Sequence, residues 1–254
     1  MVLNEIESDT PGAGRESAED AAIQLTDRDI ELFRMIHEER YLAYNQIKRA
    51  FWKDTSDVSH TCYQRVSKLV ESGYLNPVNS RKKKLIVYFL TEKSHEELKK
   101  RGLDLGLRLF RPNSNLGFYI DHNLRLTNIR LSFRELGRSH WRCERVLKEI
   151  EHRFHWIPDG VLGLYRYQAA IEYENCEKAI NKYAEFFDYF GKQKEFDLLF
   201  MILRKEPRDW LIDLEYPVER VWFMLYDDLL RNGAKAIMEN KAGHCKLTKI
   251  AGKT

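Results

Sequence analysis

The stretch "IPDGVLGLYRYQAAIEYE", residues 157–174, decides how the second half of the chain folds, because it predicts a hairpin of two strands. Alternate residues of a strand share a face, so Glu172 and Glu174 point the same way. Asp159 begins the first strand, and a turn through "LYRYQ" brings it beside Glu172. The three carboxylates are then a metal-dependent phosphodiesterase site, the remnant of such a site, or unrelated acidic residues.

Helical and strand patterns alternate on either side of this hairpin. We expect a helix at "IDHNLRLTNIRLSFRELG", an amphipathic helix at "CEKAINKYAEFFDYFGKQK" and a buried central strand at "FDLLFMILR". The segment "WRCERVLKEIE" fits a strand or a helix, "PVERVWFMLYDDLLRNG" predicts a helix ending at Gly233, and "AKAIMEN" predicts a last strand. The order αβββαβα(β) predicts an α/β domain with a mixed sheet over residues 112–254.

Residues 25–111 predict a different unit that begins with three helices. Thr26 caps the first helix, Asp29 completes a capping box, and the helix stops near Arg40. A short helix at "AYNQIKRAFW" follows, and a third helix covers residues 56–72. Gly73 supplies the left-handed residue that ends this third helix.

Beyond Gly73 the period of the pattern changes to two. The segments "YLNPVNS" and "KLIVYFLT" predict strands joined by the basic turn "SRKKK", and "TEKSHEELKKRG" predicts a further helix. Three helices followed by a basic-tipped hairpin is the order of a winged helix-turn-helix domain. The expected fold class is therefore α/β (α+β), with an N-terminal winged helix followed by a mixed-sheet domain.

Charge is unevenly distributed along the chain. Residues 1–24 carry one arginine against six acids and few large apolar residues, so we expect a disordered acidic tail. Residues 25–111 carry 18 basic against 12 acidic residues, whereas residues 112–254 carry 23 against 21. The basic excess of the first unit suggests a polyanion partner, although lysine and arginine also serve solubility alone.

The predicted third helix separates into two faces. The apolar face packs on the first two helices and consists of Cys62, Val66, Leu69 and Val70. In a helix-turn-helix protein the opposite face enters the major groove, where Gln64 can pair with adenine, Arg65 with guanine or phosphate, and Lys68 with phosphate. The DNA-binding candidates are His60, Tyr63, Gln64, Arg65, Ser67 and Lys68 on the helix, and Arg81, Lys82, Lys83 and Lys84 at the hairpin tip.

Cysteine spacing and hydropathy bound the location of the protein. The four cysteines lie far apart without a Cys/His cluster, so we expect neither structural zinc nor disulfides; they are Cys62, Cys143, Cys176 and Cys245. The sequence has no run of eighteen apolar residues and no signal-peptide core. We therefore expect a cytoplasmic protein that does not enter a membrane.

The carboxylate hairpin resembles the PD-(D/E)xK nuclease superfamily, whose core also runs αβββαβ. In that superfamily the Asp and Glu bind a metal ion, and a Lys two positions after the Glu assists hydrolysis. The resemblance implies a restriction-endonuclease-like domain in which Asp159 and Glu172 bind Mg²⁺ or Mn²⁺. Glu174 stands at the lysine position and supplies no cation, while Lys178 can replace the lysine or form an ordinary ion pair with Glu174. If the site is active, its catalytic residues are Asp159, Glu172, Glu174 and Lys178.

The whole chain is similar to the replication-relaxation family of plasmids and other mobile elements. The resemblance rests on short motifs over about residues 25–205: "TCYQRVSKLVESGYL", "YFLTEKS", "HNLRLTNIR", Trp141 with Glu144, "PDG", "IEYE" and "NKYAEFFDYF". Members of that family are also similar in showing Glu-x-acid where nucleases have Glu-x-Lys. The resemblance implies a role in replication, transfer or regulation of a mobile element.

His122 lies at the head of the helix that precedes the hairpin. It can approach the carboxylates as a ligand or base, but a histidine in this place more often caps a helix or packs in a core. We expect the capping or packing role.

Three functions compete on these grounds. The leading one is a sequence-specific or structure-specific DNA-binding protein that acts in replication, transfer or transcriptional regulation of a plasmid or other mobile element, needs no cofactor for DNA binding, and carries an inactive nuclease-like domain. The second is a metal-dependent DNA endonuclease that uses Asp159 and Glu172 with Mg²⁺ or Mn²⁺. The third is a protein-interaction regulator of the antitoxin or mobilisation-accessory type. The aromatic residues of "KYAEFFDYF" are the stretch to inspect for its interface, although their spacing suits a buried helix better. Double-stranded DNA is the expected partner, and a homodimer or a protein partner of a replication or conjugation apparatus stays open.

Overall fold

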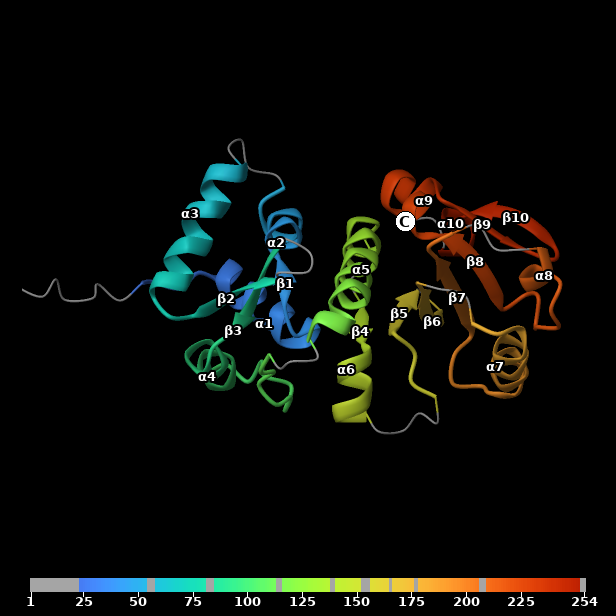
Figure 1. The fold of residues 1–254 in the computed structure, drawn as a ribbon, viewed down its shortest axis with the longest axis horizontal. Helices are drawn as coiled ribbons and strands as arrows, with labels where there is room; N and C mark the ends of the chain where they lie inside the picture. The colour runs from blue at the N-terminus through green and yellow to red at the C-terminus, as the bar shows by residue number, and fades with distance from the viewer. Residues whose placement is uncertain are drawn as a thin grey trace, which may run out of the picture.

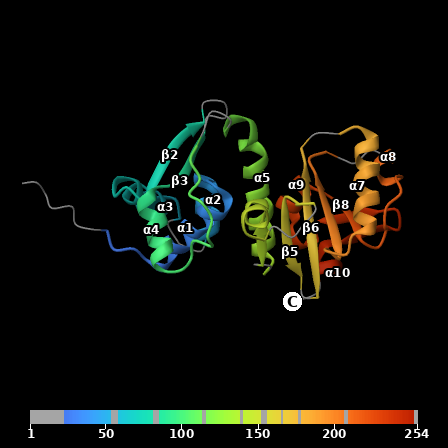
Figure 2. The same ribbon diagram turned by 90° about the horizontal axis from the view of Figure 1, so that it is seen from below.

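The computed structural model describes residues 23–53, 58–80, 85–112, 116–137, 140–151, 156–164, 166–175, 178–205 and 209–251. These residues form an α+β fold with two sheets, one of three strands and one of seven. The long helix α5 (Leu116–Glu135) lies between the two sheets, as Figures 1 and 2 both show. Most of the predicted acidic tail, residues 1–22, and the predicted basic hairpin tip, residues 81–84, lie outside the described residues.

The N-terminal elements follow the predicted order. They are α1 (Asp27–Glu39), β1 (Leu42–Ala43), α2 (Tyr44–Phe51), α3 (Val58–Glu71), β2 (Leu75–Ser80), β3 (Leu85–Leu90) and α4 (Glu92–Lys100). The short strand β1 was not predicted, because two residues are too few to show a period; it pairs antiparallel with β3, whose other edge pairs with β2. Three helices and a hairpin fit the winged-helix interpretation, which remains a prediction.

Local sequence signals explain where these helices begin and end. The Asp29 backbone N–H donates to the Thr26 side chain, and the Asp29 carboxylate accepts from the Thr26 N–H at 2.7 Å, so the predicted capping box of α1 is confirmed. Gly73, just beyond α3, has a φ of 73°, which glycine adopts without steric cost. The apolar face of α3 is buried against α1 and α2, as expected, through Cys62, Val66 and Leu69.

The larger sheet is mixed, as predicted, and has the strand order β10-β9-β8-β7-β6-β5-β4. Its strands are β4 (Trp141–Cys143), β5 (Gly160–Leu164), β6 (Tyr167–Glu174), β7 (Leu198–Leu203), β8 (Val221–Leu225), β9 (Ile237–Asn240) and β10 (Gly243–Lys246). The pairs β6–β7 and β7–β8 are parallel, and the other neighbours are antiparallel. All six residues of β7 are buried, which confirms the predicted central strand.

Helices cover both faces of this sheet. On one face α5, α9 (Tyr226–Asn232) and α10 (Leu247–Ala251) pack on the core that holds Ile171 and Tyr173 of β6. On the other face α7 (Ile180–Lys192) and α8 (Asp209–Ile212) pack on the core around Ala170. Three aromatic residues of α7 are buried in this second core, so they do not form the open contact surface considered for "KYAEFFDYF"; they are Tyr183, Phe187 and Phe190.

Two segments of the larger domain correct or refine the sequence interpretation. The single helix predicted over residues 217–233 is wrong, because residues 221–225 form β8 and only residues 226–232 are α-helical. The apolar run "VWFML" gains backbone hydrogen bonds between β7 and β9, and this pairing overrides its local pattern. The ambiguous segment after α5 contains both structures: β4 is followed by α6 (Glu144–Val146) and a π-helical turn, η1 (Leu147–Glu151). A short 3₁₀ turn, η2 (Gly233–Lys235), follows α9.

Polar contacts fasten α5 to the N-terminal elements. Arg130 of α5 donates to Glu38 at 2.5 Å and to Glu39 at 2.6 Å, both at the end of α1. Gln46 of α2 donates to the carbonyl oxygen of Leu124 at 2.6 Å. These contacts join residues on either side of position 112, where the sequence predicts a domain boundary, and that boundary remains a prediction. They hold α5 against α1 and α2, beside the cleft described below.

Candidate functional site

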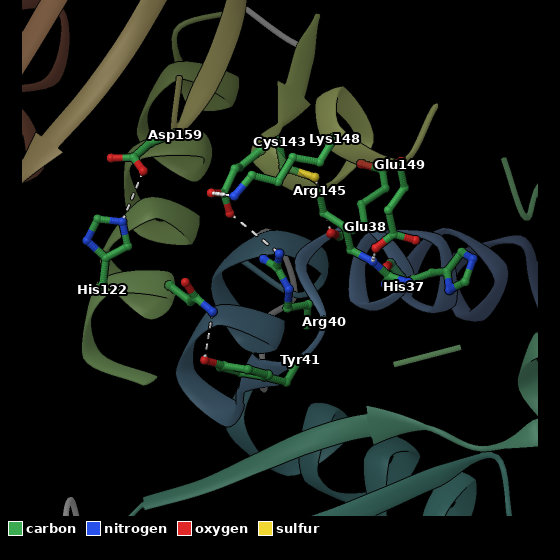
Figure 3. Close-up of polar contacts among 12 residues, drawn as sticks. His37, Glu38, Arg40, Tyr41, His122, Cys143, Arg145, Lys148, Glu149 and Asp159 are labelled. Atoms are coloured by element: carbon green, nitrogen blue, oxygen red, sulfur yellow. Dashed lines mark hydrogen bonds and ion pairs between the residues drawn. The ribbon is translucent and has the colours of Figure 1, made fainter. Parts of the chain in front are cut away.

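The β5–β6 hairpin brings Asp159 beside Glu172. Gly160 pairs with Ile171 in the antiparallel register, so the preceding Asp159 stands across from Glu172. The Asp159 carboxylate accepts a hydrogen bond from the Tyr173 backbone N–H at 2.8 Å, which fixes its orientation. Its other oxygen lies 3.1 Å from Nε2 of His122 (Figure 3). The apposition of two carboxylates expected from the sequence is therefore present in the fold.

Glu172 carries the least compensated charge of this pair. Its side chain lies on the α7 side of the sheet, because Ile171 and Tyr173 occupy the opposite face. Burial, followed by the negative charge of Asp159, raises the pKa of Glu172 well above its ordinary value. Two neighbouring carboxylates of this kind are stabilised by a shared proton or by a bound cation.

Glu174 is engaged differently from Glu172. Tyr183 of α7 donates its hydroxyl to one carboxylate oxygen at 2.9 Å, and the Nζ of Lys178 lies 3.0 Å from the other. The predicted ion pair between Glu174 and Lys178 is therefore present. Burial opposes the charge of Lys178, but Glu174 outweighs it and the pKa of Lys178 is raised. Lys178 thus carries a stable positive charge at the edge of the carboxylate group.

His122 does more than cap or pack, which corrects the role expected for it. Its ring packs on Tyr173 with 5.6 Å between centroids, and its Nε2 also meets Asp159. Burial alone would lower the pKa of His122, but the hydrogen bond to Asp159 and the charge of that carboxylate raise it. The pair stabilises the protonated imidazole and orients the Asp159 carboxylate.

Residues from outside the hairpin complete the cleft. It has a volume of about 740 Å³, and its lining includes Asp159, Glu172, Glu174, Lys178, His122, Arg40, Glu144 and Lys148. Arg40 follows α1 in the left-handed region, with φ of 76° and ψ of −40°, and its guanidinium lies 3.5 Å from Glu144. Lys148 donates to the same carboxylate at 2.5 Å, and Figure 3 shows both cations on the side of the cleft across from His122.

Sequence reasoning did not single out Arg40 or Lys148, and it used Glu144 only as part of a family motif. They reach the cleft through the packing of α1 and α6 against the hairpin, and Glu144 is placed by its N–H, which donates to the Asp159 carbonyl at 3.1 Å. The spacing of residues within one segment does not predict such a contact between segments that are distant in the sequence. The one local signal is that Arg40, which is not a glycine, directly follows α1. From the sequence alone this position looks like any other helix end.

The α3 surface separates the predicted DNA-binding residues into two groups. Exposed side chains on this surface are His60, Tyr63, Gln64 and Lys68, and Ser67 is half-buried. Arg65 instead forms a two-pronged ion pair with Asp29 and donates to the Gln24 carbonyl at 2.8 Å. Its guanidinium therefore holds the start of α1 against α3. The hairpin-tip candidates Arg81, Lys82, Lys83 and Lys84 lie outside the described residues.

Two further expectations can be compared with the described part of the chain. Within it, no group of three or more His, Cys, Asp or Glu side chains is arranged to hold a metal ion, and the cysteines Cys62, Cys143 and Cys245 are free. Cys176 lies outside the described residues. The helices that the structure describes include none with the length and apolar character needed to cross a bilayer.

The fold and the site define an α+β protein with an exposed polar helix on one side and a mixed-sheet carboxylate cleft beside α5. The model of the replication-relaxation family matches residues 33–195, so the chain belongs to that family. Membership points to a role in replication or in the processes of mobile elements. Comparisons with curated proteins and with solved structures find no match.

Proposed function

We propose that this protein binds double-stranded DNA through α3, in the replication, transfer or transcriptional regulation of a plasmid or other mobile element. The observation that carries the proposal is the two-sided character of α3: on its apolar side Cys62, Val66 and Leu69 are buried and Val70 is partly buried, and most of its polar side is open to solvent. A helix anchored in this way presents a rigid row of donors and acceptors, as a groove-reading helix must. The family and the basic character of residues 25–111 support the same function.

The exposed row suits both base and phosphate contacts. Gln64 can form two hydrogen bonds with adenine, and its amide lies 2.7 Å from the His60 ring, which limits its rotation. Tyr63 is 62% exposed, so its ring and hydroxyl are accessible to a partner. The exposed ammonium group of Lys68 suits a backbone phosphate. Arg65 is left out of this set because Asp29 neutralises it.

The test measures the affinity of two single variants for two kinds of DNA duplex. One kind has mixed sequence, and the other carries the site that the unmodified protein selects from a random library. Lys68→Ala removes one phosphate contact, so it weakens all duplexes alike and lowers the slope of log affinity against log salt by about 0.9. Gln64→Ala lowers the preference for the selected site by about 1–3 kcal/mol of discrimination. Fluorescence anisotropy at several salt concentrations measures both effects.

A matched control is Lys192→Ala, an exposed lysine at the end of α7, the helix that packs on the opposite face of the larger sheet from α5. It removes the same charge and leaves both the slope and the preference unchanged. Replacing Lys82, Lys83 and Lys84 together by Ala tests the hairpin tip in the same assay, and an unchanged slope removes the tip from the proposal. If the protein shows no salt-sensitive DNA binding and a stable protein partner is recovered with it, the interaction-regulator function is favoured instead.

A second candidate is a metal-dependent DNA endonuclease, and the apposition of Asp159 with Glu172 favours it. A Mg²⁺ ion commonly takes one or two carboxylates and keeps several waters, so these two residues fit such an ion without a third protein ligand. The raised pKa of Glu172 shows that its negative charge is poorly compensated, and a bound ion would supply the missing positive charge. Lys178 stands near the pair, although Glu174 holds its ammonium group. This engagement is why we place DNA holding ahead of cleavage.

Cleavage is tested with plasmid, single-stranded and branched DNA in the presence of Mg²⁺ or Mn²⁺. The endonuclease predicts metal-dependent nicking that Asp159→Ala and Glu172→Ala abolish. Tyr183→Phe, which removes only the hydroxyl that holds Glu174, retains activity. Absence of nicking by the unmodified protein on every substrate with both metals contradicts this second candidate and leaves the DNA-binding proposal standing.

A further inference from the structure

A second cavity, distinct from the carboxylate cleft, is lined mainly by cations. It has a volume of about 360 Å³ and lies where α1 begins and where α2 and α5 end. Four basic residues and one acidic residue line it: Arg28, Arg49, Lys53, Arg134 and Glu135. Ala50, Phe51 and Leu131 form its apolar floor. We call this cavity the basic pocket.

The single carboxylate of the basic pocket is already used. Arg49 binds Glu135 through two hydrogen bonds, at 2.9 and 2.7 Å, and donates to Ser132 at 3.0 Å. This pairing lowers the pKa of Glu135. Within the described ranges, neither Arg28, Lys53 nor Arg134 forms an ion pair with a carboxylate. Glu135 also interacts with the charge of Lys53, but of the described residues it is the one carboxylate that lines the pocket beside four cations, so the pocket keeps an excess of three positive charges.

Aromatic rings hold two of these cations in place. The guanidinium of Arg28 lies 5.1 Å from the ring centroid of Trp52, and that of Arg134 lies 5.4 Å from the ring centroid of Phe51. Trp52 is fully buried, so its position is fixed by the N-terminal core. A guanidinium on an aromatic face keeps N–H groups along its edge, where they can donate to a planar or tetrahedral oxyanion. The rings thus reduce the ordering cost of binding an anion.

We propose that the basic pocket binds a phosphate group, and that this phosphate belongs to the backbone of the duplex held by α3. The second part rests on the proposed function. An oxyanion with several acceptor oxygens satisfies three convergent cations and relieves their mutual repulsion. Arginine is well suited to phosphate, because its fork of donors matches two phosphate oxygens at once.

The pocket lies beside the contact between α1 and α3, because Arg28 lines it and the next residue, Asp29, binds α3. Arg65 of α3 is tied to Asp29, the neighbour of Arg28 in α1. On a helix, Thr61 and Lys68 lie four residues before and three residues after Arg65, so they share its edge of α3. Figures 1 and 2 both show α2 between α3 and α5, so the end of α2 bridges the proposed groove-reading helix and the pocket. We infer that a DNA backbone running from Lys68 along this edge of α3 approaches Arg28 and Lys53.

The experiment uses the full chain and the double variant Lys53→Gln/Arg134→Gln. Both side chains are exposed, so the replacements leave the core intact, which thermal unfolding checks. The matched control is Lys192→Gln/Lys194→Gln, which removes two exposed charges at the end of α7. The pocket variant lowers the salt slope by about 0.9 for each phosphate that it no longer binds. For one such phosphate, the affinity ratio of wild type to variant shrinks roughly threefold between 50 and 200 mM salt. Equal slopes for the two double variants overturn the proposal.

A second measurement separates this proposal from the proposed function. Inorganic phosphate is titrated into the unmodified protein and into Arg28→Gln, and arginine side-chain NMR signals are followed. Signal changes in the unmodified protein that are absent in Arg28→Gln support the pocket. If Lys68→Ala and Gln64→Ala leave duplex binding unchanged while the pocket variant weakens it, the α3 proposal fails and the pocket stands. Phosphate binding without any duplex binding overturns the assignment to DNA, and the absence of both overturns the pocket.

Discussion

Two pairs of acidic residues in this protein have opposite surroundings. Glu38 and Glu39 at the end of α1 are buried, and Arg130 binds both of them. Asp159 and Glu172 lie together in the cleft, and among the described residues no arginine pairs with either. One arginine balances both acids of the first pair. In the second pair His122 binds Asp159, whereas the charge of Glu172 is only partly offset by Lys178 and is left for a proton or an external cation.

This difference separates a structural role from a binding role better than residue type does. Burial opposes the charge of Arg130, but Glu39 and Glu38 outweigh it and its pKa is raised, so the junction between α1 and α5 stays ionised and closed. At the cleft, burial and repulsion act in the same direction on Glu172 and raise its pKa. A partly buried acid without a matching base is costly to folding, which suggests that it is kept for a ligand.

The largest effect is expected from Arg130→Met. It leaves Glu39 buried without a counter-charge and Glu38 with only the more exposed Arg34, 3.7 Å away, so it lowers the free energy of unfolding by about 3–5 kcal/mol. Urea denaturation followed by circular dichroism measures the change. The reference is Lys192→Met, which breaks an exposed pair with Asp188 and costs at most about 1 kcal/mol.

A combined variant sharpens this result. Adding Glu38→Gln and Glu39→Gln to Arg130→Met removes the stranded charges, so much of the stability returns. A triple variant that is less stable than Arg130→Met alone contradicts the view that stranded charge is the cause.

The next effect is acid sensitivity at another contact of α1, where His37 packs on His95 of α4 and binds the Asp104 carbonyl. Burial, then the charge of Arg145, lowers the pKa of His37 to about 4. The unfolded chain has the ordinary value near 6.5 and takes up the proton first, so this contribution to stability is complete above pH 6.5 and lost as pH falls towards 4. The loss reaches up to about 3 kcal/mol. Unfolding curves at pH 7, 5.5 and 4 measure it.

His37→Gln is the matching variant, because the glutamine amide nitrogen stands near the place of His37 Nε2 and keeps a donor for the Asp104 carbonyl, 2.9 Å from that nitrogen. Its stability is lower at pH 7, and it falls less between pH 7 and pH 4 than that of the unmodified protein. An equal fall in both proteins assigns the acid sensitivity to other groups.

A smaller effect of opposite sign is expected at the cleft. The raised pKa of Glu172 means that the folded chain holds its proton more tightly than the unfolded chain. Ionisation therefore costs stability as pH rises through the ordinary glutamate range up to the folded pKa, and the cost stays constant above it. Glu172→Gln removes this cost, so it raises the free energy of unfolding at pH 7 on the order of 1 kcal/mol and leaves it unchanged near pH 4.

Glu174→Gln is the control, since Lys178 and Tyr183 already hold that carboxylate. It gives no gain at pH 7. Should Glu172→Gln prove as destabilising as Glu174→Gln, the cleft pair is balanced like the junction pair and the comparison fails.

Elements with strong local signals were predictable from the sequence, whereas tertiary contacts between distant elements were not. The capping box of Thr26, the buried side of α3 and the Asp159–Glu172 apposition follow from spacing within short segments, and the structure has them. The strand β8 was missed because its apolar run continues without a break into the helical pattern of α9. The contributions of Arg40 and Lys148 to the cleft depend on how α1 and α6 pack, which no local period encodes.

Helix α5 shares its residues between two cores. Leu131 belongs to the core of α1, α2 and α3, whereas Ile129 and Phe133 belong to a core of the larger sheet. The N-terminal unit is therefore unsuited to transplantation as a self-contained module. A fragment that stops at residue 111 leaves Glu38 and Glu39 without Arg130, so any chimera built on this unit must carry α5 with it.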